Sequence, residues 1–541
     1  MDHCLFVRAS PLILAALSAC GEGAPEPRAS APPGGVRVMA ASAGDTGISP
    51  GGAQQTYGCE PDGAVPGSVY FFVDAAALSG GNGARDAPFR TVQAAYLAVQ
   101  SGQKAVLCVA EGTYVERVGS TADRFAAQTE YALVGGFRAG SRFAVRDSLA
   151  HPTTIQAPDR SGATIVFGNV KSITLDGHRI TGGLHGVLIS GGYSAGRSVT
   201  LRNNHIFGNG VEGQLDHSGG GLRLSGGQIL IEHNLIEGNR AGAGGAGLYV
   251  GAPASAERNT KRGGVLHVTS ALATISRNVV RDNVARHDTP HGAGISVSMN
   301  ARIDHNLIED NRGLGPLSGP GGQGVGGGLI AQAQYATVIV DSNWIAGNIA
   351  QKAGGGIFID EASIGTIVNN VVVGNEGVGA ITVDGRASGS GAEDRGYATI
   401  ASNTVVGNTS QALYLLDSTV AAYNNVFWDN GGGADVLSAA GGSLSESITL
   451  DHNLLVSGCS GTALCQMGLR NLIGVAPQLL DPAAADYSLA AGSPALDAGA
   501  ATFGPALAYA GALTAAPAAD YDGAPRPQGP GIDLGALERT P

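Results

Sequence analysis

The sequence predicts an all-β solenoid in which short strands stack coil upon coil in parallel register. One observation is a phrase (Asn, two mostly apolar residues, two variable residues, Asn) that occurs nine times. Its copies begin at residues 204, 234, 278, 306, 343, 370, 403, 425 and 453, at intervals of 22 to 44 residues, and the last copy has lost its second asparagine. A second observation is that short apolar stretches alternating with period two flank the phrase, as strands do. One structural unit with loops of variable length explains both.

Stacking gives such a unit the core that it cannot form alone. Coils about 4.8 Å apart pair each strand with the next, so nine phrase-bearing coils predict a rod of roughly 40 Å. Asparagine is expected at tight corners because it tolerates left-handed backbone and its amide can bond to the neighbouring corner, and glycine where the turning chain is crowded. The middle apolar residue of each phrase is predicted to point inward: Ile206, Ile236, Val280, Ile308, Ile345, Val372, Val406, Phe427 and Leu455.

Glycine-led strands such as GGGLRLS (219–225), GAGISVS (292–298) and GGGIFID (354–360) follow the phrases. Over roughly residues 68–538 this pattern resembles the right-handed parallel β-helix proteins, the architecture of pectate-lyase-like polysaccharide enzymes and many bacterial surface proteins. The resemblance implies a right-handed parallel β-helix solenoid with a short N-terminal capping helix. A leucine-rich or propeller repeat is the structural rival. It fails because the chain has no leucine ladder and no regular block of four strands.

The N-terminus reads as an export signal. Arg8 precedes the apolar run Leu12–Ala19, which is too short to span a bilayer as a helix. The run ends in LSAC (17–20), which resembles a bacterial lipobox. This implies cleavage before Cys20, acylation of its thiol and, because Gly21 rather than Asp follows, delivery to the outer membrane of a Gram-negative cell. The alternative is an ordinary secretory signal with a chance cysteine.

Composition and cysteines divide the rest of the chain. The expected parts are a signal peptide (1–19), an acylated cysteine with a flexible Pro/Gly/Ala/Ser tether (20–67), a cap with the first coils (68–150), the repeats (151–475) and a C-terminal capping segment (476–541). Cys4 leaves with the signal and Cys20 carries lipid. The simplest pairing of the remaining four in an oxidising compartment is Cys59–Cys108 and Cys459–Cys465.

Both ends of the predicted rod carry covering segments. Near the N-terminus, strands at 69–73 and 105–109 flank a helix of about Ala87–Gln100, whose apolar face would cover the open edge of the first coil. The string APFRTVQAAYLAV (87–99) resembles the usual opening of bacterial β-helix domains. GSPALDAG (492–499) and DLGALE (533–538) resemble the closing segment of choice-of-anchor and polymorphic outer-membrane proteins, which implies a cap for the last coil. Its acidic residues either bind an ion or, as we favour, are solvated turn residues.

Composition limits the partners. The net charge is −12 and no basic stripe is present, so nucleic acid is a poor partner. A strongly anionic polysaccharide would need a local basic patch or a bound cation. Aromatic residues are only 5%, which argues against a processive polysaccharide enzyme. The expected partner is a polysaccharide or another cell-envelope component, the expected contact with a membrane is the lipid anchor, and the expected state is a monomer.

Loops are where function is expected, because the coils are scaffold. Insertions at 210–219, 284–292 and 312–326 should leave one corner and stack into a wall, and those at 252–264 and 385–396 should leave another. A groove between the walls is the default binding site. The first wall carries Asp216, His217, His287, Asp288 and His291. Such residues bind a metal or shuttle protons, or, as we favour, are exposed loop residues without a role.

A second cluster lies on the strand before the phrase. Glu232, Ser276, Asp304 and Asp341 are predicted to occupy equivalent positions on successive coils, with Arg277 one coil from the neighbouring carboxylates of Asp304 and Asp341. Pectate-lyase-like enzymes place calcium-binding acids and an arginine on such a face. The resemblance therefore implies Glu232, Arg277, Asp304 and Asp341 as catalytic candidates, with Ca²⁺ as the cofactor to consider. A solvated polar row is the favoured alternative, because stronger signatures of polygalacturonases and alginate epimerases are missing.

These observations favour a lipid-anchored, extracytoplasmic β-helix protein that binds glycans or other envelope components without catalysis. One alternative is a polysaccharide lyase or glycoside hydrolase that acts through the acidic and arginine-bearing face. Another is an adhesin-like structural surface protein with no small ligand.

Overall fold

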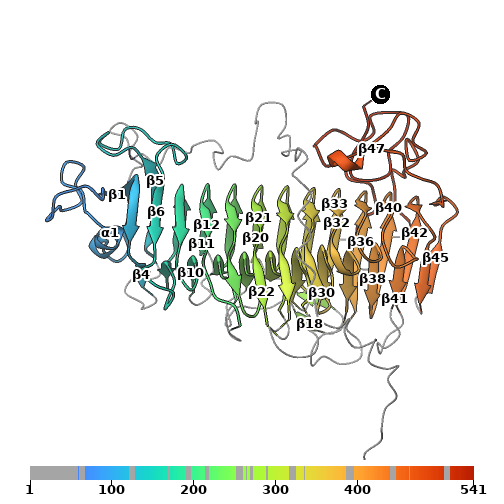
Figure 1. The fold of residues 1–541 in the computed structure, drawn as a ribbon, viewed down its shortest axis with the longest axis horizontal. Helices are drawn as coiled ribbons and strands as arrows, with labels where there is room; N and C mark the ends of the chain where they lie inside the picture. The colour runs from blue at the N-terminus through green and yellow to red at the C-terminus, as the bar shows by residue number, and fades with distance from the viewer. Residues whose placement is uncertain are drawn as a thin grey trace, which may run out of the picture.

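A computed structural model shows a rod of stacked coils, each built from three main strands (Figure 1). It describes residues 59, 67–120, 128–168, 170–190, 197–213, 218–251, 260–262, 265–267, 272–287, 290–315, 324–333, 335–385, 395–438, 446–461, 464–504 and 512–540. Each strand of the three main sheets pairs in parallel with the equivalent strand of the next coil, which confirms the predicted stacking.

Sheet I is the longest of the parallel sheets. Its strands, in spatial order, are β1 (Ser68–Val73), β2 (Lys104–Ala110), β5 (Glu130–Phe137), β8 (Ser172–Asp176), β11 (Ser198–Arg202), β14 (Gln228–Glu232), β20 (Leu272–Ser276), β24 (Ala301–Asp304), β28 (Thr337–Asp341), β32 (Ile364–Val368), β36 (Gly396–Ala401), β39 (Ser418–Tyr423), β42 (Ser447–Asp451) and β45 (Leu464–Met467).

Sheet II contains the glycine-led strands. They are β4 (Val118–Ser120), β7 (Ile165–Phe167), β10 (Val187–Ile189), β13 (Leu222–Ser225), β17 (Leu248–Gly251), β23 (Ile295–Ser298), β27 (Leu329–Gln332), β31 (Ile357–Asp360), β35 (Ile381–Asp384), β38 (Leu413–Leu416), β41 (Val436–Ser438) and β44 (Cys459–Gly461).

Sheet III contains the strands of the asparagine phrase. They are β3 (Gly112–Val115), β6 (Thr153–Gln156), β9 (His178–Thr181), β12 (His205–Phe207), β15 (Leu235–Glu237), β21 (Val279–Arg281), β25 (Leu307–Glu309), β29 (Trp344–Ala346), β33 (Val371–Val373), β37 (Thr404–Val406), β40 (Val426–Trp428), β43 (Leu454–Leu455) and β46 (Leu472–Ile473).

A fourth parallel sheet, sheet IV, follows the phrase in the middle coils and was not predicted. Its strands are β16 (Arg240–Ala241), β22 (Val284–Arg286), β26 (Arg312–Leu314), β30 (Ile349–Ala353) and β34 (Glu376–Val378). Two antiparallel pairs lie outside the coils: β18 (Thr260–Arg262) with β19 (Val265–His267), and β47 (Leu479–Asp481) with β48 (Asp486–Leu489), the second pair joined by a 3-10 helix, η1 (Pro482–Ala484).

One continuous apolar core runs along the inside of the rod. The predicted inward residues belong to it and are fully buried, with one exception. The prediction for Val406 is wrong. Val405 pairs with Val372 and enters the core, whereas Val406 faces outward beneath the C-terminal segment. In every copy the third residue of the phrase points inward. At 405–406 two valines follow one another, and the prediction chose the second instead of the first.

The asparagines form two ladders inside the corners. In each step the Oδ1 atom of one asparagine accepts hydrogen bonds from the backbone N–H and the Nδ2 of the asparagine one coil before, as Asn343 does from Asn306 at 2.9 Å each. The expected bonding between corners is therefore confirmed, but the expected left-handed asparagine is wrong. The residue before the first asparagine takes that conformation, as His305 does (φ 54°), and so does the Gly or Asp before the second, as Asp310 does (φ 54°).

Helix α1 (Val92–Ala98) covers the N-terminal end of the core, as predicted, but it is shorter than expected. It begins after Thr91, whose Oγ1 accepts from the N–H of Ala94, because Phe89 is held in extended pairing with Val73. The carboxylate of Glu116 accepts from the N–H groups of Val92 and Gln93. Within the described residues, no helix has the length and hydropathy of a membrane-spanning segment.

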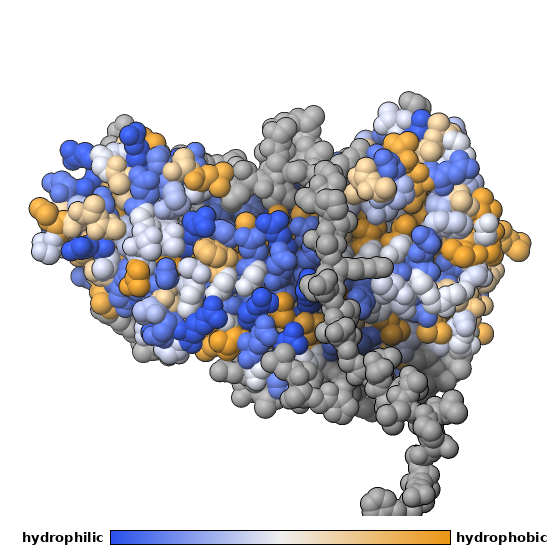
Figure 2. Space-filling view, viewed as in Figure 1, coloured by the Kyte–Doolittle hydropathy of each residue, from blue (hydrophilic) through white to orange (hydrophobic). Residues whose placement is uncertain are grey.

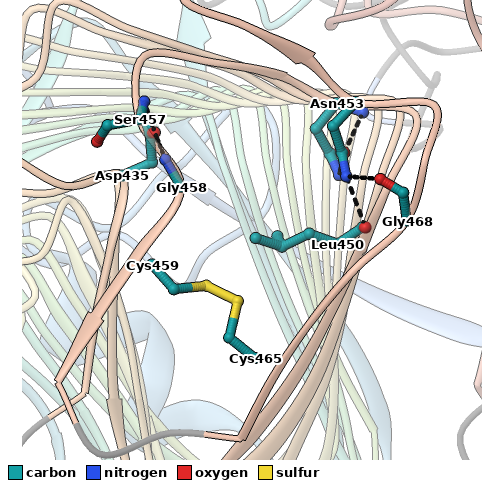
Figure 3. The surroundings of a disulfide bond; sticks show 9 residues. Asp435, Leu450, Asn453, Ser457, Gly458, Cys459, Cys465 and Gly468 are labelled. Atoms are coloured by element: carbon teal, nitrogen blue, oxygen red, sulfur yellow. Dashed lines mark hydrogen bonds between the residues drawn. A yellow bond between two sulfur atoms is a disulfide. The ribbon is translucent and has the colours of Figure 1, made fainter.

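Both predicted disulfides are present. Cys59–Cys108 links a residue within the predicted tether (20–67) to β2, and Cys459–Cys465 lies inside the last coil, where it connects β44 to β45 (Figure 3). Cys459 and Cys465 pack against the end of the core. The disulfide therefore closes the core at the end of the rod opposite α1.

The C-terminal segment lies against the side of the rod rather than over its end, which corrects the predicted cap. Leu489 and Leu534 pack on the outer face of sheet III, and Phe503 packs on that of sheet I (Figure 1). The prediction that its acidic residues are solvated is correct for Asp497 and Asp522, which are exposed, and wrong for three others. Asp520, Asp533 and Glu538 are buried, and Glu538 forms an ion pair with buried Arg526 at 2.6 Å, because the segment has its own small polar core.

Candidate functional site

Two segments pack on the outer face of sheet I, one at each end, and among the described residues no comparable apolar covering lies on its middle coils. At one end, Phe143 from the β5–β6 connection packs on β1, β2 and β5, and at the other the C-terminal segment packs on β32, β36 and β39. Figure 1 shows both coverings rising on the same side of the rod. One column of residues, which pair with one another from coil to coil across sheet I, is apolar where a covering packs on it. Val134 contacts the first covering, and Val368, Ala401 and Tyr423 contact the second.

Between the coverings the same column is polar. It reads Asp176, Arg202, Glu232, Ser276, Asp304 and Asp341, one residue per coil. We call the stretch from Glu232 to Asp341, together with Arg277, Arg302 and His305, the polar strip. The predicted equivalence of Glu232, Ser276, Asp304 and Asp341 is confirmed by their register. Arg277 lies one residue further on, at the corner between sheets I and III, in left-handed backbone.

Arg302 connects the two central carboxylates of the strip. Its Nη2 lies 2.7 Å from Asp341 Oδ2, and its Nε lies 3.7 Å from Asp304 Oδ2. His305 Nδ1 lies 3.0 Å from the same Asp304 oxygen. Burial raises the pKa of Asp304, but the hydrogen bond with His305 and the charge of Arg302 outweigh it and hold that pKa below its ordinary value. Asp304 is therefore an ionised, oriented acceptor at neutral pH.

Two groups of the strip have unused hydrogen-bonding capacity. The Oδ1 atom of Asp304 is buried and makes no hydrogen bond of ordinary geometry with any described residue, which in a native site is a place for a water or ligand donor. Arg277 is exposed, and its guanidinium contacts Ser276 Oγ at 3.3 Å without a carboxylate partner among the described residues. Glu232 is half-buried, between Arg202 and Ser276 in the register.

The catalytic candidates predicted from the sequence do not include Arg302 or His305. Alternation along β24 places Arg302 on the same face as Asp304, two residues on, so the signal was present in the sequence. His305 follows Asp304 directly, and its position at the corner turns its ring back to that carboxylate.

The polar strip adjoins a buried cluster that has a structural role. Asp176 is fully buried and accepts from Arg146 at 2.8 Å, from Arg202 at 3.0 Å and from Asn203 at 3.0 Å. Because each of its oxygens is engaged by the protein and the side chain is fully buried, this carboxylate joins the β5–β6 connection to the coils and is not accessible to a ligand.

The loop histidines do not join the strip. His291 lies between sheets IV and II, where its Nδ1 is 2.7 Å from Gln332 Oε1, and the N–H of His287 donates to Leu314. Asp216, His217 and Asp288 lie outside the described residues, as does Cys20. The described ends of the first three insertions do stack, because Ser218, Gly244, His291 and Val325 form successive bridges. The groove between two loop walls stays a prediction.

Metal chemistry has no ready donor set in the part of the chain that the structure describes. There, no group of three or more His, Cys, Asp or Glu side chains is arranged to hold an ion. In the strip, the side chains of Arg302, His305, Ser342 and Asn369 contact the two central carboxylates, and Arg302 supplies a positive charge to both.

Two family models match the chain. Residues 152–330 match "Right handed beta helix region", and residues 321–455 match "Periplasmic copper-binding protein (NosD)". No curated protein matches. Among solved structures, pectate lyase Pel9A is 16% identical to this chain, with a TM-score of 0.37. The match covers 87% of this chain and 96% of the Pel9A chain. XylC in complex with xylose is 11% identical to this chain, with a TM-score of 0.43. The match covers 87% of this chain and 99% of the XylC chain. The parallel sheets and the first family match together show that this chain is a right-handed parallel β-helix.

Proposed function

We propose that this chain is an extracytoplasmic β-helix protein that binds a polysaccharide or another polyhydroxylated envelope component along the polar strip without cleaving it. The observation that carries the proposal is the polar strip on the middle coils of sheet I, where carboxylate and guanidinium groups recur from coil to coil between the two coverings. A spacing of about 4.8 Å between coils presents acceptors and donors at regular steps along the rod. A polymer with hydroxyl groups along its length suits that pattern.

Location outside the cytoplasm is supported by two observations. Two disulfides are typical of oxidising compartments, and the family matched at residues 321–455 is described as periplasmic. A lipid anchor on Cys20 and delivery to the outer membrane belong to the same proposal. Loss of radiolabelled palmitate incorporation in Cys20→Ser would support the anchor, and absence of label from the wild type would refute it.

Copper binding does not fit this chain. Copper sites in proteins use imidazole, thiolate and thioether ligands. Residues 321–455 contain no cysteine or methionine and a single histidine, His452. Its Nε2 lies 3.2 Å from Arg470 Nη1, its Nδ1 lies 3.2 Å from Asp451 Oδ2, and the residue is buried.

Binding is favoured over hydrolysis because a general acid needs a raised pKa, whereas the pKa of Asp304 is lowered. One observation favours a lyase as the second candidate. Asp304 contacts Nδ1 of His305 and so orients the ring with Nε2 pointing away from that carboxylate. Arg277 occupies the position equivalent to His305 on the preceding coil. In that reading His305 would be the base that removes a proton from the sugar.

A panel of pectin, alginate and glycosaminoglycans separates these readings. The binding proposal predicts retention on at least one of them with no release of reducing ends or unsaturated products. Product formation that is lost in Asp304→Ala and His305→Ala would instead establish the lyase. Neither binding nor product would favour an adhesin-like structural protein.

A further inference from the structure

The first covering of sheet I is fixed to the rod by specific contacts. It is the connection between β5 and β6, residues 138–152, and its Phe143 packs on Phe72 with ring centroids 4.9 Å apart. Arg146 of the same connection lies 2.8 Å from Asp176 of β8, whose carboxylate is fully buried. The first covering therefore reaches along the outer face of sheet I as far as β8.

The second covering, the C-terminal segment, begins where the polar strip ends. Asn369, the residue that follows β32, donates from its side-chain amide to Ala519 O at 3.1 Å and to Asp341 Oδ1 at 3.4 Å. Two coils further on, Asn424 and Ala500 exchange hydrogen bonds of 2.9 and 2.8 Å. One side chain thus joins the last carboxylate of the strip to this covering, and a second attachment holds the covering against the rod.

Five coils of sheet I lie between the two coverings. Their strands are β11, β14, β20, β24 and β28, which separate β8 from β32. The four steps from the first of these strands to the last amount to roughly 19 Å. A pyranose unit in an extended sugar chain is about as long as one step between coils. The space between the coverings therefore matches a stretch of about five sugar units.

A longer chain has no straight path along the outer face of sheet I. Figure 1 shows the two coverings rising on the same side of the rod, and Figure 2 shows hydrophilic residues gathered over the middle coils in the same view. A chain that continues past five coils must bend away from the rod at one covering or at both, and ordering the bent units costs free energy without new contacts. On a strip without coverings, added units would instead offer further registers and raise the affinity.

We propose that the polar strip selects a short oligosaccharide of about five sugar units over a long chain of the same sugar. The inference rests on the proposed function and specifies the size of its ligand. The coverings set the limit of length, and the carboxylate and guanidinium groups on the coils between them provide the hydrogen bonds.

Oligomers of galacturonate, alginate and hyaluronan, from two to about twenty units long, test this limit when they are titrated into the full-length protein in a calorimeter. For a sugar that binds, the dissociation constant per chain should fall up to about five units and then rise roughly five-fold towards twenty, because the longer chains bend at the coverings. A dissociation constant that stays level or keeps falling beyond five units would overturn the limit and leave the proposed function intact. Absence of binding by every oligomer and by the parent polymers would refute the proposed function itself, and the limit with it.

A bulky residue within the strip tests whether the chain lies along the rod with one unit per coil. In Glu232→Trp the indole occupies the outer face of β14, so that only the coils of β20, β24 and β28 remain before the second covering. The best-bound length should then shift from about five units to about three. Leu235→Trp is the matched control, because Leu235 belongs to the same coil but lies on sheet III. An unchanged optimum in Glu232→Trp, or an equal shift in both variants, would contradict the proposal.

Discussion

His178 occupies a position where the ladder would otherwise have an asparagine, and its buried ring makes the stability of the protein depend on pH. It occupies the ladder position before Asn204, since its N–H donates to Asn204 Oδ1 as the asparagines do to one another. Its ring is buried, and among the described residues neither ring nitrogen has a partner at ordinary hydrogen-bond geometry. Burial lowers the pKa of His178 to about 4, so the folded protein holds this histidine neutral.

The stability of the protein should therefore fall as the pH falls from about 6.5 towards 4, because the unfolded chain binds a proton that the folded chain excludes. At pH 5 the loss from this residue is about 2 kcal/mol. In His178→Asn that loss should disappear, because an asparagine carries no proton and can continue the ladder to Asn204. Denaturant midpoints at pH 7 and pH 5 measure the difference. An equal pH dependence in wild type and variant would show that His178 is not responsible.

The ladders are the elements that hold the coils in register. Asn306 Nδ2 donates to Ile275, Asp304 and Asn343, and its Oδ1 accepts from Asn278, all inside the rod. Asn471 makes the same kinds of bonds in the last coil, where it is half-buried and water can replace them.

Asn306→Ala should lower the free energy of unfolding by about 4 kcal/mol, because several buried backbone groups lose their partners at once. Asn471→Ala, the matched change at the end of the same ladder, should cost about 1 kcal/mol. Chemical denaturation of both variants measures these values. Equal losses would mean that burial within the ladder has no influence.

Most of the strands and their pairing could be predicted from the sequence. The period-two stretches and the phrase predicted sheets I, II and III and their register, because an apolar interior imposes alternation. Sheet IV was not predicted, since its short strands, such as Arg312–Leu314, show no alternation. The start of α1 was misplaced because Phe89 pairs with Val73, a contact between distant residues that local helix propensity does not reveal.

At the scale of the whole molecule, the coverings decide which part of a uniform scaffold faces solvent. The sequence brought Asp304 and Asp341 together correctly, but it did not show that Val134 and Val368, in the same column, are covered by distant segments. It also placed the C-terminal segment at the end of the rod, because a resemblance to closing segments does not specify which surface they close.

The rod carries a matched pair of arginines that can test the central claim. Arg302 and Arg281 are 40% and 41% exposed, and each lies near two carboxylates from different coils: Asp304 and Asp341 for Arg302, and Glu237 and Glu309 for Arg281. Arg302 lies in the polar strip, whereas Arg281 lies on the outer face of sheet III. Their replacement by glutamine therefore removes the same charge in equivalent settings, and only one of the two positions belongs to the proposed site.

The most direct test is the affinity of Arg302→Gln and Arg281→Gln for immobilised pectin, alginate and glycosaminoglycans, measured beside the wild type. The account predicts that Arg302→Gln weakens binding roughly ten-fold, equivalent to about 1.4 kcal/mol, and that Arg281→Gln binds as the wild type does. Equal affinities of the two variants, or no binding by the wild type to any of these polymers, would contradict it.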